Sequence, residues 1–187
     1  MVYLASQSPR REQLLKKIIK DFKIVVPDVT EKEEQFSQFT PKQLALYNAR
    51  IKAEDVYKKT GGFVIAADTV VAYGNELLFK PQNRKQAYEM LSLLSGKTHR
   101  VITGVCVIGD TAHEAAVTSY VTFNRLDKKF IDDYIESGKC YDKAGGYGIQ
   151  DSVEFARKLS GSKSNVIGFP VKTVKRLLKL SGYKNFN

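Results

Sequence analysis

The run FVIAADTVVAY, residues 63–73, constrains the fold of this chain more than any other stretch. It is apolar and rich in β-branched residues, a pattern that predicts a buried strand. A single acidic residue, Asp68, interrupts the run. Burying a carboxylate is costly unless it is paired, hydrogen-bonded or bound to a metal. Asp68 is therefore either a functional group, as a metal ligand or general base, or the end of the strand, where its side chain lies in solvent.

Helices and strand pairs alternate along the rest of the sequence. Cap signals and apolar periodicity predict helices near residues 9–18, 40–59, 83–96, 127–138 and 170–180. Further strands are expected over residues 22–29, 77–81, 98–110, 114–126, 153–159 and 164–169, with 77–81 as the hairpin partner of 63–73. This order favours an α/β fold with a mixed sheet over a purely parallel one. The 187 residues, 43% of them hydrophobic, are enough for one core, so we expect a single domain over residues 1–187.

The net charge of +10 indicates which partners the chain can attract. Residues 155–187 hold no Asp or Glu and eight basic residues, which suits a phosphorylated small molecule or nucleic acid, or forms a solvated basic face. No apolar run reaches the length of a membrane span, and the first residues lack the plan of a signal peptide. Two cysteines are too few for a disulfide framework or a zinc site. We therefore expect a reduced, cytoplasmic protein without a membrane partner.

Two arginines, Arg10 and Arg11, fall in the first turn of the helix that starts at Pro9. The amino end of a helix carries partial positive charge and favours anions, so two cations there call for an explanation. Lys52 lies in the second helix, and Lys80 ends the strand expected to pair with the Asp68 strand. Singly, such lysines are usually plain surface residues. Together with the arginines they form a candidate polyphosphate clamp, in which an anion lies between the arginines and the helix amides.

Other polar groups suggest a metal and a nucleobase. Mg²⁺ is typically held by one or two carboxylates and by substrate phosphates, so Glu31 or Glu33 of the acidic loop can supply a second carboxylate beside Asp68. Gln150 ends the glycine-rich stretch AGGYGIQ. Its amide offers both a donor and an acceptor, which suits the edge of a nucleobase. We expect metal-and-carboxylate chemistry rather than a covalent intermediate, because no arrangement for nucleophilic catalysis stands out.

Six motifs, in this order, resemble those of the Maf family of nucleotide pyrophosphatases: LASQSPRREQLL, IAADTVV, FKP, LSGKTHRVITGV, DKAGGYGIQD and VIGFP. The resemblance covers nearly the whole chain. It implies a fold like that of the inosine triphosphate pyrophosphatases, with a long mixed sheet, flanking helices and a cleft between two lobes. It also implies hydrolysis of a nucleoside triphosphate to the monophosphate and pyrophosphate with a divalent metal cation, Mg²⁺ or Mn²⁺, and a homodimer. SPRR together with YGIQ resembles the branch that acts on dTTP and UTP.

The resemblance also implies roles for individual residues. Asp68 matches the catalytic acidic residue and a metal ligand, with Glu31, or Glu33 in another register, as the second acidic residue at the metal. Positions linked to substrate choice are Arg10, Thr69 and Gln150. Residues that line the phosphate site are Ser6, Arg11, Lys52 and Lys80.

The chain departs from the family pattern beside the expected base-recognition residue. Gly146 and Asp151 stand where Ala and Gly are usual, and Asp151 adds a negative charge next to Gln150. The alternative to an enzyme is a basic protein, linked to septum formation, that binds nucleic acid or a nucleotide without catalysis. The scattered aromatic residues do not form a stacking platform for nucleic acid, which disfavours that alternative.

Overall fold

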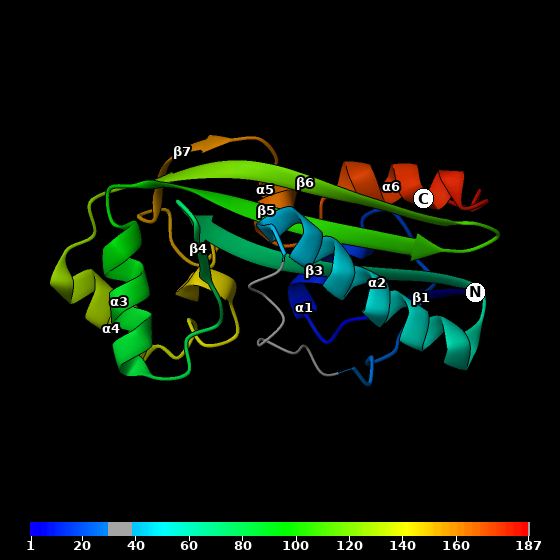
Figure 1. Cartoon of the computed structure of the whole chain (residues 1–187), viewed down its shortest axis with the longest axis horizontal. Coiled ribbons are helices and arrows are strands. Elements are labelled where there is room, and N and C mark those ends of the chain that lie inside the picture. The colour runs from blue at the N-terminus through cyan, green and yellow to red at the C-terminus, as the bar shows by residue number, and fades with distance from the viewer. Residues whose placement is uncertain (30–38, 187) are drawn as a thin grey trace. The chain divides into compact units, whose positions relative to one another are not determined.

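Over the residues that the structure describes, 1–29 and 39–186, the chain forms a seven-stranded mixed sheet with flanking helices (Figure 1), which confirms the predicted fold class. This computed structural model has the strand order β2-β1-β3-β5-β6-β7, and β4 pairs with β3 beside that series. The strands are β1 (Val2–Leu4), β2 (Lys23–Ile24), β3 (Phe63–Tyr73), β4 (Glu76–Leu78), β5 (Thr98–Ile108), β6 (Ala112–Phe123) and β7 (Ala156–Ser160). The helices are α1 (Pro9–Leu15), α2 (Pro41–Thr60), α3 (Arg84–Leu94), α4 (Lys128–Glu136), the 3₁₀ helix η2 (Ala144–Gly146), α5 (Lys163–Val166) and α6 (Val171–Leu180).

The chain divides into two compact units. Unit 1 comprises residues 1–69, 103–117 and 168–187, and unit 2 comprises residues 70–102 and 118–167. Strands β3, β5 and β6 each contribute residues to both units. The single domain over residues 1–187 and the cleft between two lobes stay predictions. In the described part of the chain, no helix is both long and apolar enough to cross a membrane.

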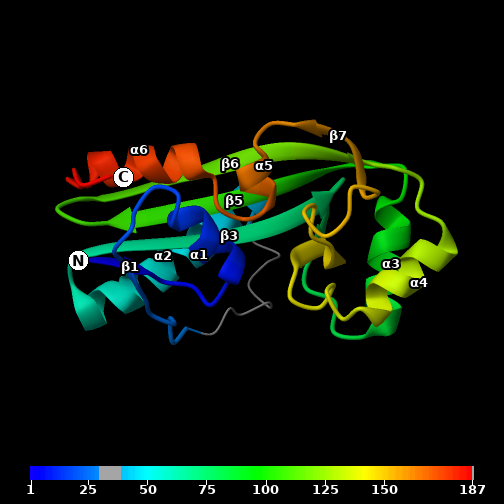
Figure 2. The same ribbon diagram turned by 180° about the vertical axis from the view of Figure 1, so that it is seen from behind.

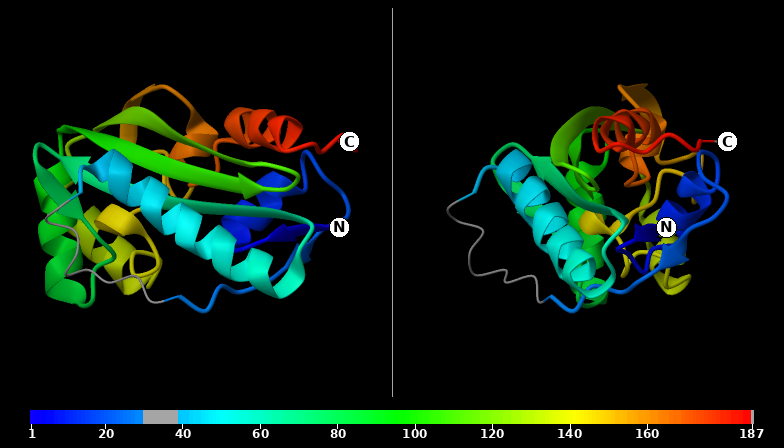
Figure 3. Two further views of the ribbon diagram at one scale, coloured as in Figure 1. Left: turned by 45° about the vertical axis from the view of Figure 1, so that its right-hand side comes forward. Right: turned by 90° about the vertical axis from the view of Figure 1, so that its right-hand side faces the viewer.

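Unit 1 is built around β1 and the first half of β3. Strand β1 pairs in parallel with both β2 and β3, and Leu4 lies opposite Ile65. Helices α1 and α2 cover opposite faces of these strands, as Figures 2 and 3 show from different sides. Small side chains of α2, Ala49 and Ala53, pack into a core that includes the free, buried Cys106. The small residues let the helix lie close to the sheet.

Unit 2 contains the predicted hairpin and an aromatic core. Strand β4 returns antiparallel to the end of β3, with Leu78 opposite Val71. Helices α3 and α4 begin at the predicted caps, because the side chains of Asn83 and Asp127 accept hydrogen bonds from backbone N–H groups of the first turns. Phe123, Phe155 and other rings fill the core of this unit. Hairpin and caps are therefore confirmed.

Two of the predicted strands require correction. Residues 164–169 do not form a strand, because the Ser162 side chain accepts the backbone N–H of Asn165 at 3.3 Å and starts the short helix α5. Of residues 22–29, only Lys23 and Ile24 pair as β2. Pro27 brings no N–H donor to a ladder, which is one reason why the strand is so short.

Candidate active site

Asp68 lies inside β3 and is buried, with 8% of its surface exposed. It is not the solvent-exposed end of a strand. The Lys52 ammonium pairs with its Oδ1 at 2.7 Å, and the Asn48 amide donates to its Oδ2 at 3.1 Å. The carboxylate thus has a cation and a hydrogen-bond donor, the two conditions under which burying it is tolerated.

Helix α2 carries both partners of Asp68. Asn48 and Lys52 are four residues apart and so lie on one helical face, which also carries the buried Ala45 and Ala49. This face lies directly on β5, because a Cβ added at Gly104 would come far inside van der Waals contact of the Ala45 carbonyl oxygen. Glycine at position 104 therefore sets how closely α2, and with it the Lys52 ammonium, approaches the strands.

Arg11 organises a second cluster, which we call the Arg11 cluster: Ser6, Arg11, Thr69, Thr103 and Gly168. Its guanidinium donates to the Gly168 carbonyl at 3.0 Å, to Ser6 Oγ at 3.2 Å and to Thr69 Oγ1 at 3.4 Å. The hydroxyls of Thr69 and Thr103 lie 3.0 Å apart. One of the two cations at the start of α1 therefore binds oxygens of its own unit, which gives it a structural role that the sequence did not suggest.

The two groups of site residues lie on opposite faces of β3. Side chains alternate along a strand, so Asp68 points towards α2 and Thr69 towards α1. Strand β1 pairs with residues 63–65 of β3 and β4 with residues 71–73, while β5 takes the other edge. Along the sequence of β3, Asp68 and Thr69 thus lie between the residues that pair with β1 and those that pair with β4.

The remaining predicted residues are distributed as follows. Arg10 is partly exposed in the first turn of α1. Lys80 is exposed just after β4, and Gln150 is exposed in the loop after η2, both in unit 2. Glu31 and Glu33 lie outside the described residues. A joint site of all these residues with Asp68 stays a prediction.

Sequence reasoning missed Asn48, Thr103 and Gly168. A signal existed for Asn48, because Asn48 and Lys52 interrupt the apolar face of the helix at a spacing of four residues. Gly168 contributes a backbone carbonyl, which leaves no trace in the side-chain pattern. Thr103 is buried within a strand run that is otherwise apolar, and its hydroxyl had no predicted partner.

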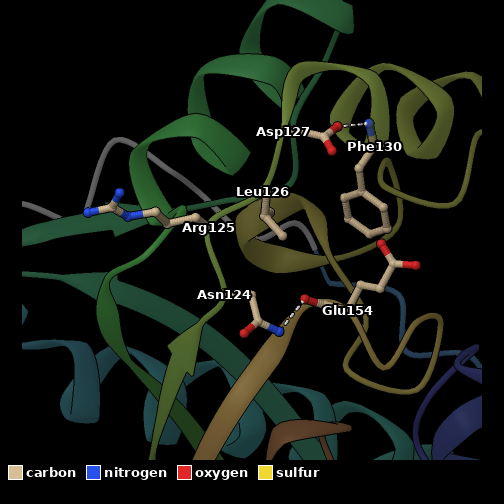
Figure 4. A pocket seen from close by; sticks show the side chains of 6 residues that line it. All are labelled: Asn124, Arg125, Leu126, Asp127, Phe130 and Glu154. Carbon is tan, nitrogen blue, oxygen red and sulfur yellow. Dashed lines mark hydrogen bonds between the residues drawn. The ribbon is translucent and has the colours of Figure 1, made fainter.

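A hollow in unit 2 contains none of the predicted site residues. It is lined by Asn124, Arg125, Leu126, Asp127, Phe130 and Glu154 (Figure 4). Two of its polar side chains already serve the fold: Asp127 accepts the backbone N–H of Phe130, and Asn124 donates to the Glu154 carbonyl (Figure 4). We therefore assign no catalytic role to this hollow.

The Asp68 carboxylate is compatible with a divalent cation. Among residues 1–29 and 39–186, no group of three or more His, Cys, Asp or Glu is arranged to hold a metal ion. Each carboxylate oxygen offers about two lone pairs, and Lys52 and Asn48 each occupy one. A cation that keeps waters and binds substrate phosphates needs only one or two protein carboxylates, so the donor set fits Mg²⁺ or Mn²⁺.

Comparisons with known proteins find matches that span nearly the whole chain. The model of the family described as Maf-like protein matches residues 1–181. A protein of Thermococcus onnurineus named dTTP/UTP pyrophosphatase is 45% identical over 96% of this chain and 97% of its own length. The protein of that name from Carboxydothermus hydrogenoformans is 44% identical over 97% of this chain and 99% of its own.

Among solved structures, a HAM1 protein from Coxiella burnetii covers 96% of this chain and 98% of its own, at 16% identity and a TM-score of 0.49. The family assignment depends instead on the family model, which spans nearly every residue, and on relatives that align over almost their full length. The chain therefore belongs to the family of Maf-like proteins.

Proposed function

We propose that this chain is a nucleoside triphosphate pyrophosphatase that hydrolyses dTTP and UTP to the monophosphate and pyrophosphate, assisted by Mg²⁺ or Mn²⁺. The observation that carries the proposal is the buried Asp68, whose two oxygens are held by Lys52 and Asn48. A carboxylate fixed in this way, in a chain whose full-length relatives are named dTTP/UTP pyrophosphatase, is suited to position a water molecule.

Asp68 acts on the attacking water. One of its oxygens accepts a proton of the water, whose oxygen forms a bond to the α-phosphorus. The bond between the α-phosphorus and the oxygen that bridges to the β-phosphorus breaks, and pyrophosphate leaves with that oxygen. Lys52 and Asn48 keep the carboxylate in one orientation, so little rearrangement is needed at the moment of reaction.

Cationic and hydroxyl groups of the predicted set bind the negatively charged phosphates. The Arg11 cluster presents Ser6 and Thr69 hydroxyls with a guanidinium already ordered by three acceptors. Of the other predicted cations, Arg10 is partly exposed and Lys80 is exposed. A divalent cation bound at Asp68 would add Lewis acidity and neutralise charge that develops on the leaving pyrophosphate. Positioning and charge neutralisation supply most of the rate in such transfers.

A nucleic-acid- or nucleotide-binding role without catalysis is less well supported. A clamp for a phosphate backbone needs cations directed to solvent. Lys52 is instead buried against Asp68. A buried carboxylate is also out of place in a surface that binds polyanions by charge. The proposal includes a homodimer and a cytoplasmic location.

The test compares wild type with Asp68→Asn in pyrophosphate release. We expect Asp68→Asn to keep nucleotide binding and to lose at least about a hundredfold in kcat, as for removal of a general base. Asp133→Asn, which changes an exposed carboxylate of α4 that pairs with Lys129, is the control and keeps its kcat within twofold of wild type. Full activity of folded Asp68→Asn would refute the role of Asp68.

A further inference from the structure

We infer that Asp151, braced by Lys143 and Tyr134, is a positioning residue that fixes the Gln150 amide in the orientation that accepts uracil or thymine and rejects cytosine. The inference rests on the proposed function and on the prediction from the sequence that the Gln150 amide contacts the base. It concerns residues of unit 2 alone: Tyr134 on α4, and Lys143, Gln150 and Asp151 in the segment that follows α4 (yellow to orange in Figure 2). Asp151 is the residue that departs from the family pattern and adds a negative charge next to Gln150.

The contact between Gln150 and Asp151 determines which way the amide faces. The Gln150 amide nitrogen donates to Asp151 Oδ1 at 3.0 Å. An ionised carboxylate only accepts hydrogen bonds, so the amide nitrogen, and not its oxygen, must face Asp151. The Gln150 carbonyl oxygen and the second N–H therefore remain for a ligand, and the side chain is exposed to one.

Asp151 cannot easily turn away, because two buried groups hold its other oxygen. The Tyr134 hydroxyl donates to Oδ2 at 2.6 Å, and the Lys143 ammonium lies 3.3 Å from the same oxygen. The Lys143 and Asp151 side chains are only 9% and 13% exposed. Burial and the bond to Asp151 raise the pKa of Tyr134 above its ordinary value, so its hydroxyl stays a donor. The cation also offsets the negative charge beside the ligand.

The backbone of the loop is shaped around this network. A Cβ added at Gly148 would clash with the Gln150 amide nitrogen and would lie 2.6 Å from Asp151 Oδ2 and 2.8 Å from the Lys143 Cε. The Gly148 N–H also donates to the Tyr134 hydroxyl at 3.2 Å, and its carbonyl accepts the Asp151 N–H at 2.9 Å. Glycine at position 148 therefore leaves room for the contacts among the side chains of Tyr134, Lys143, Gln150 and Asp151.

The fixed amide distinguishes the two pyrimidine edges. Uracil and thymine present an N3–H donor beside the O4 acceptor, which match the outward carbonyl and N–H of Gln150. Cytosine presents the reverse, an N3 acceptor beside an amino donor. To bind cytosine the amide must turn over, which would place its oxygen 3.0 Å from Asp151 Oδ1 and set two acceptors against each other. Without an ionised residue at position 151, turning the Gln150 amide over would cost little free energy.

The decisive variant is Asp151→Asn, because the asparagine oxygen must stay with the Tyr134 and Lys143 donors, so its amide nitrogen faces Gln150 and the orienting acceptor is lost at nearly constant volume. We would measure kcat/KM for UTP and for CTP. Wild type is expected to prefer UTP, and Asp151→Asn to lower the ratio of UTP to CTP about tenfold, mainly through a lower KM for CTP. That change corresponds to about 1.4 kcal/mol. A purely structural role would lower activity on both substrates and leave the ratio unchanged.

Two further variants make the result decisive. Asp142→Asn removes the other carboxylate on Lys143, 2.7 Å away, without touching Gln150, and should keep the ratio within twofold of wild type. Tyr134→Phe removes only the hydroxyl donor to Asp151 and should lower the ratio of UTP to CTP by less than tenfold. This variant keeps the inference testable if Asp151→Asn fails to fold. Melting temperatures of all variants establish that the compared proteins are folded.

The outcomes separate this inference from the proposed function. If wild type prefers UTP, Gln150→Ala abolishes the preference and Asp151→Asn keeps it, the positioning role is wrong and the enzyme stands. If wild type has no preference, or Gln150→Ala leaves it unchanged, the inference is wrong too. If wild type hydrolyses no nucleotide, the proposed function fails, and calorimetric binding of UMP and CMP decides the inference by the same ratio.

Discussion

Replacing Lys52 by methionine tests the buried ion pair at the centre of unit 1. The Lys52 and Asp68 charges are 2.7 Å apart, and each side chain is only 11% exposed. With an effective dielectric constant of about 20, Coulomb's law gives an attraction of about 6 kcal/mol at this distance. Desolvation of the two groups offsets much of that attraction, so the net worth of the pair is far smaller than the Coulomb energy.

Breaking the pair is nevertheless costly. In Lys52→Met the Asp68 carboxylate keeps, within the described part of the chain, the Asn48 amide as a donor and remains buried. Leaving one charge of a buried pair without its partner typically costs about 3–5 kcal/mol. Because a domain is stable by about 5–15 kcal/mol, this is a large fraction of the total. We therefore expect Lys52→Met to lower the free energy of unfolding by about 3 kcal/mol or more.

Urea unfolding of wild type, Lys52→Met, Asp68→Asn and the double variant measures the coupling. The double variant has no buried charge at this position, so we expect it to be more stable than Lys52→Met, with a coupling of at least about 1 kcal/mol. The reasoning is refuted if Lys52→Met unfolds within about 0.5 kcal/mol of wild type, or if the two substitutions are additive.

Two other predictions concern packing and pH. Gly104→Ala forces α2 away from β5, because the added Cβ would overlap the Ala45 carbonyl oxygen. We expect this variant to lose about 1–3 kcal/mol of unfolding free energy. Urea and thermal midpoints equal to those of wild type would contradict this prediction. Burial lowers the pKa of His99 to about 4, whereas an unfolded histidine titrates near 6.5. Between these values the unfolded state binds the extra proton, so stability falls as pH decreases from about 6.5 to 4, by up to about 3 kcal/mol. Urea midpoints of wild type and His99→Gln measured from pH 7 to 4.5 check this, and parallel pH dependence would contradict it.

Local signals in the sequence were sufficient for much of the fold. The capping box of Thr40 and Gln43 depends on residues three apart, and both of its hydrogen bonds are present. The hairpin of β3 and β4 was likewise evident from adjacent runs. By contrast, the segment at Ser162 has a β-like composition but a serine cap at its start, and the cap determines the structure. Composition and capping compete over such short lengths, so pattern alone does not settle them.

The candidate site was predicted less completely, because its contacts join distant residues. The resemblance supplied Lys52 and Asp68, but their pairing depends on the close approach of α2 at Gly104. One acceptor of the Arg11 guanidinium is a backbone carbonyl 157 positions away, at Gly168, which no local pattern specifies. Asp151, which in the sequence is only a departure from the family pattern, accepts a hydrogen bond from the Gln150 amide in the structure.

Pyrophosphate release from dTTP, UTP, CTP, ATP and GTP, with Mg²⁺ or Mn²⁺, tests the central claim most directly when wild type is measured beside Asp68→Asn. The account predicts preferential turnover of dTTP and UTP by wild type and a loss of at least about a hundredfold in the variant. Absence of turnover of every nucleotide by the folded wild type, or equal turnover by Asp68→Asn, would contradict it.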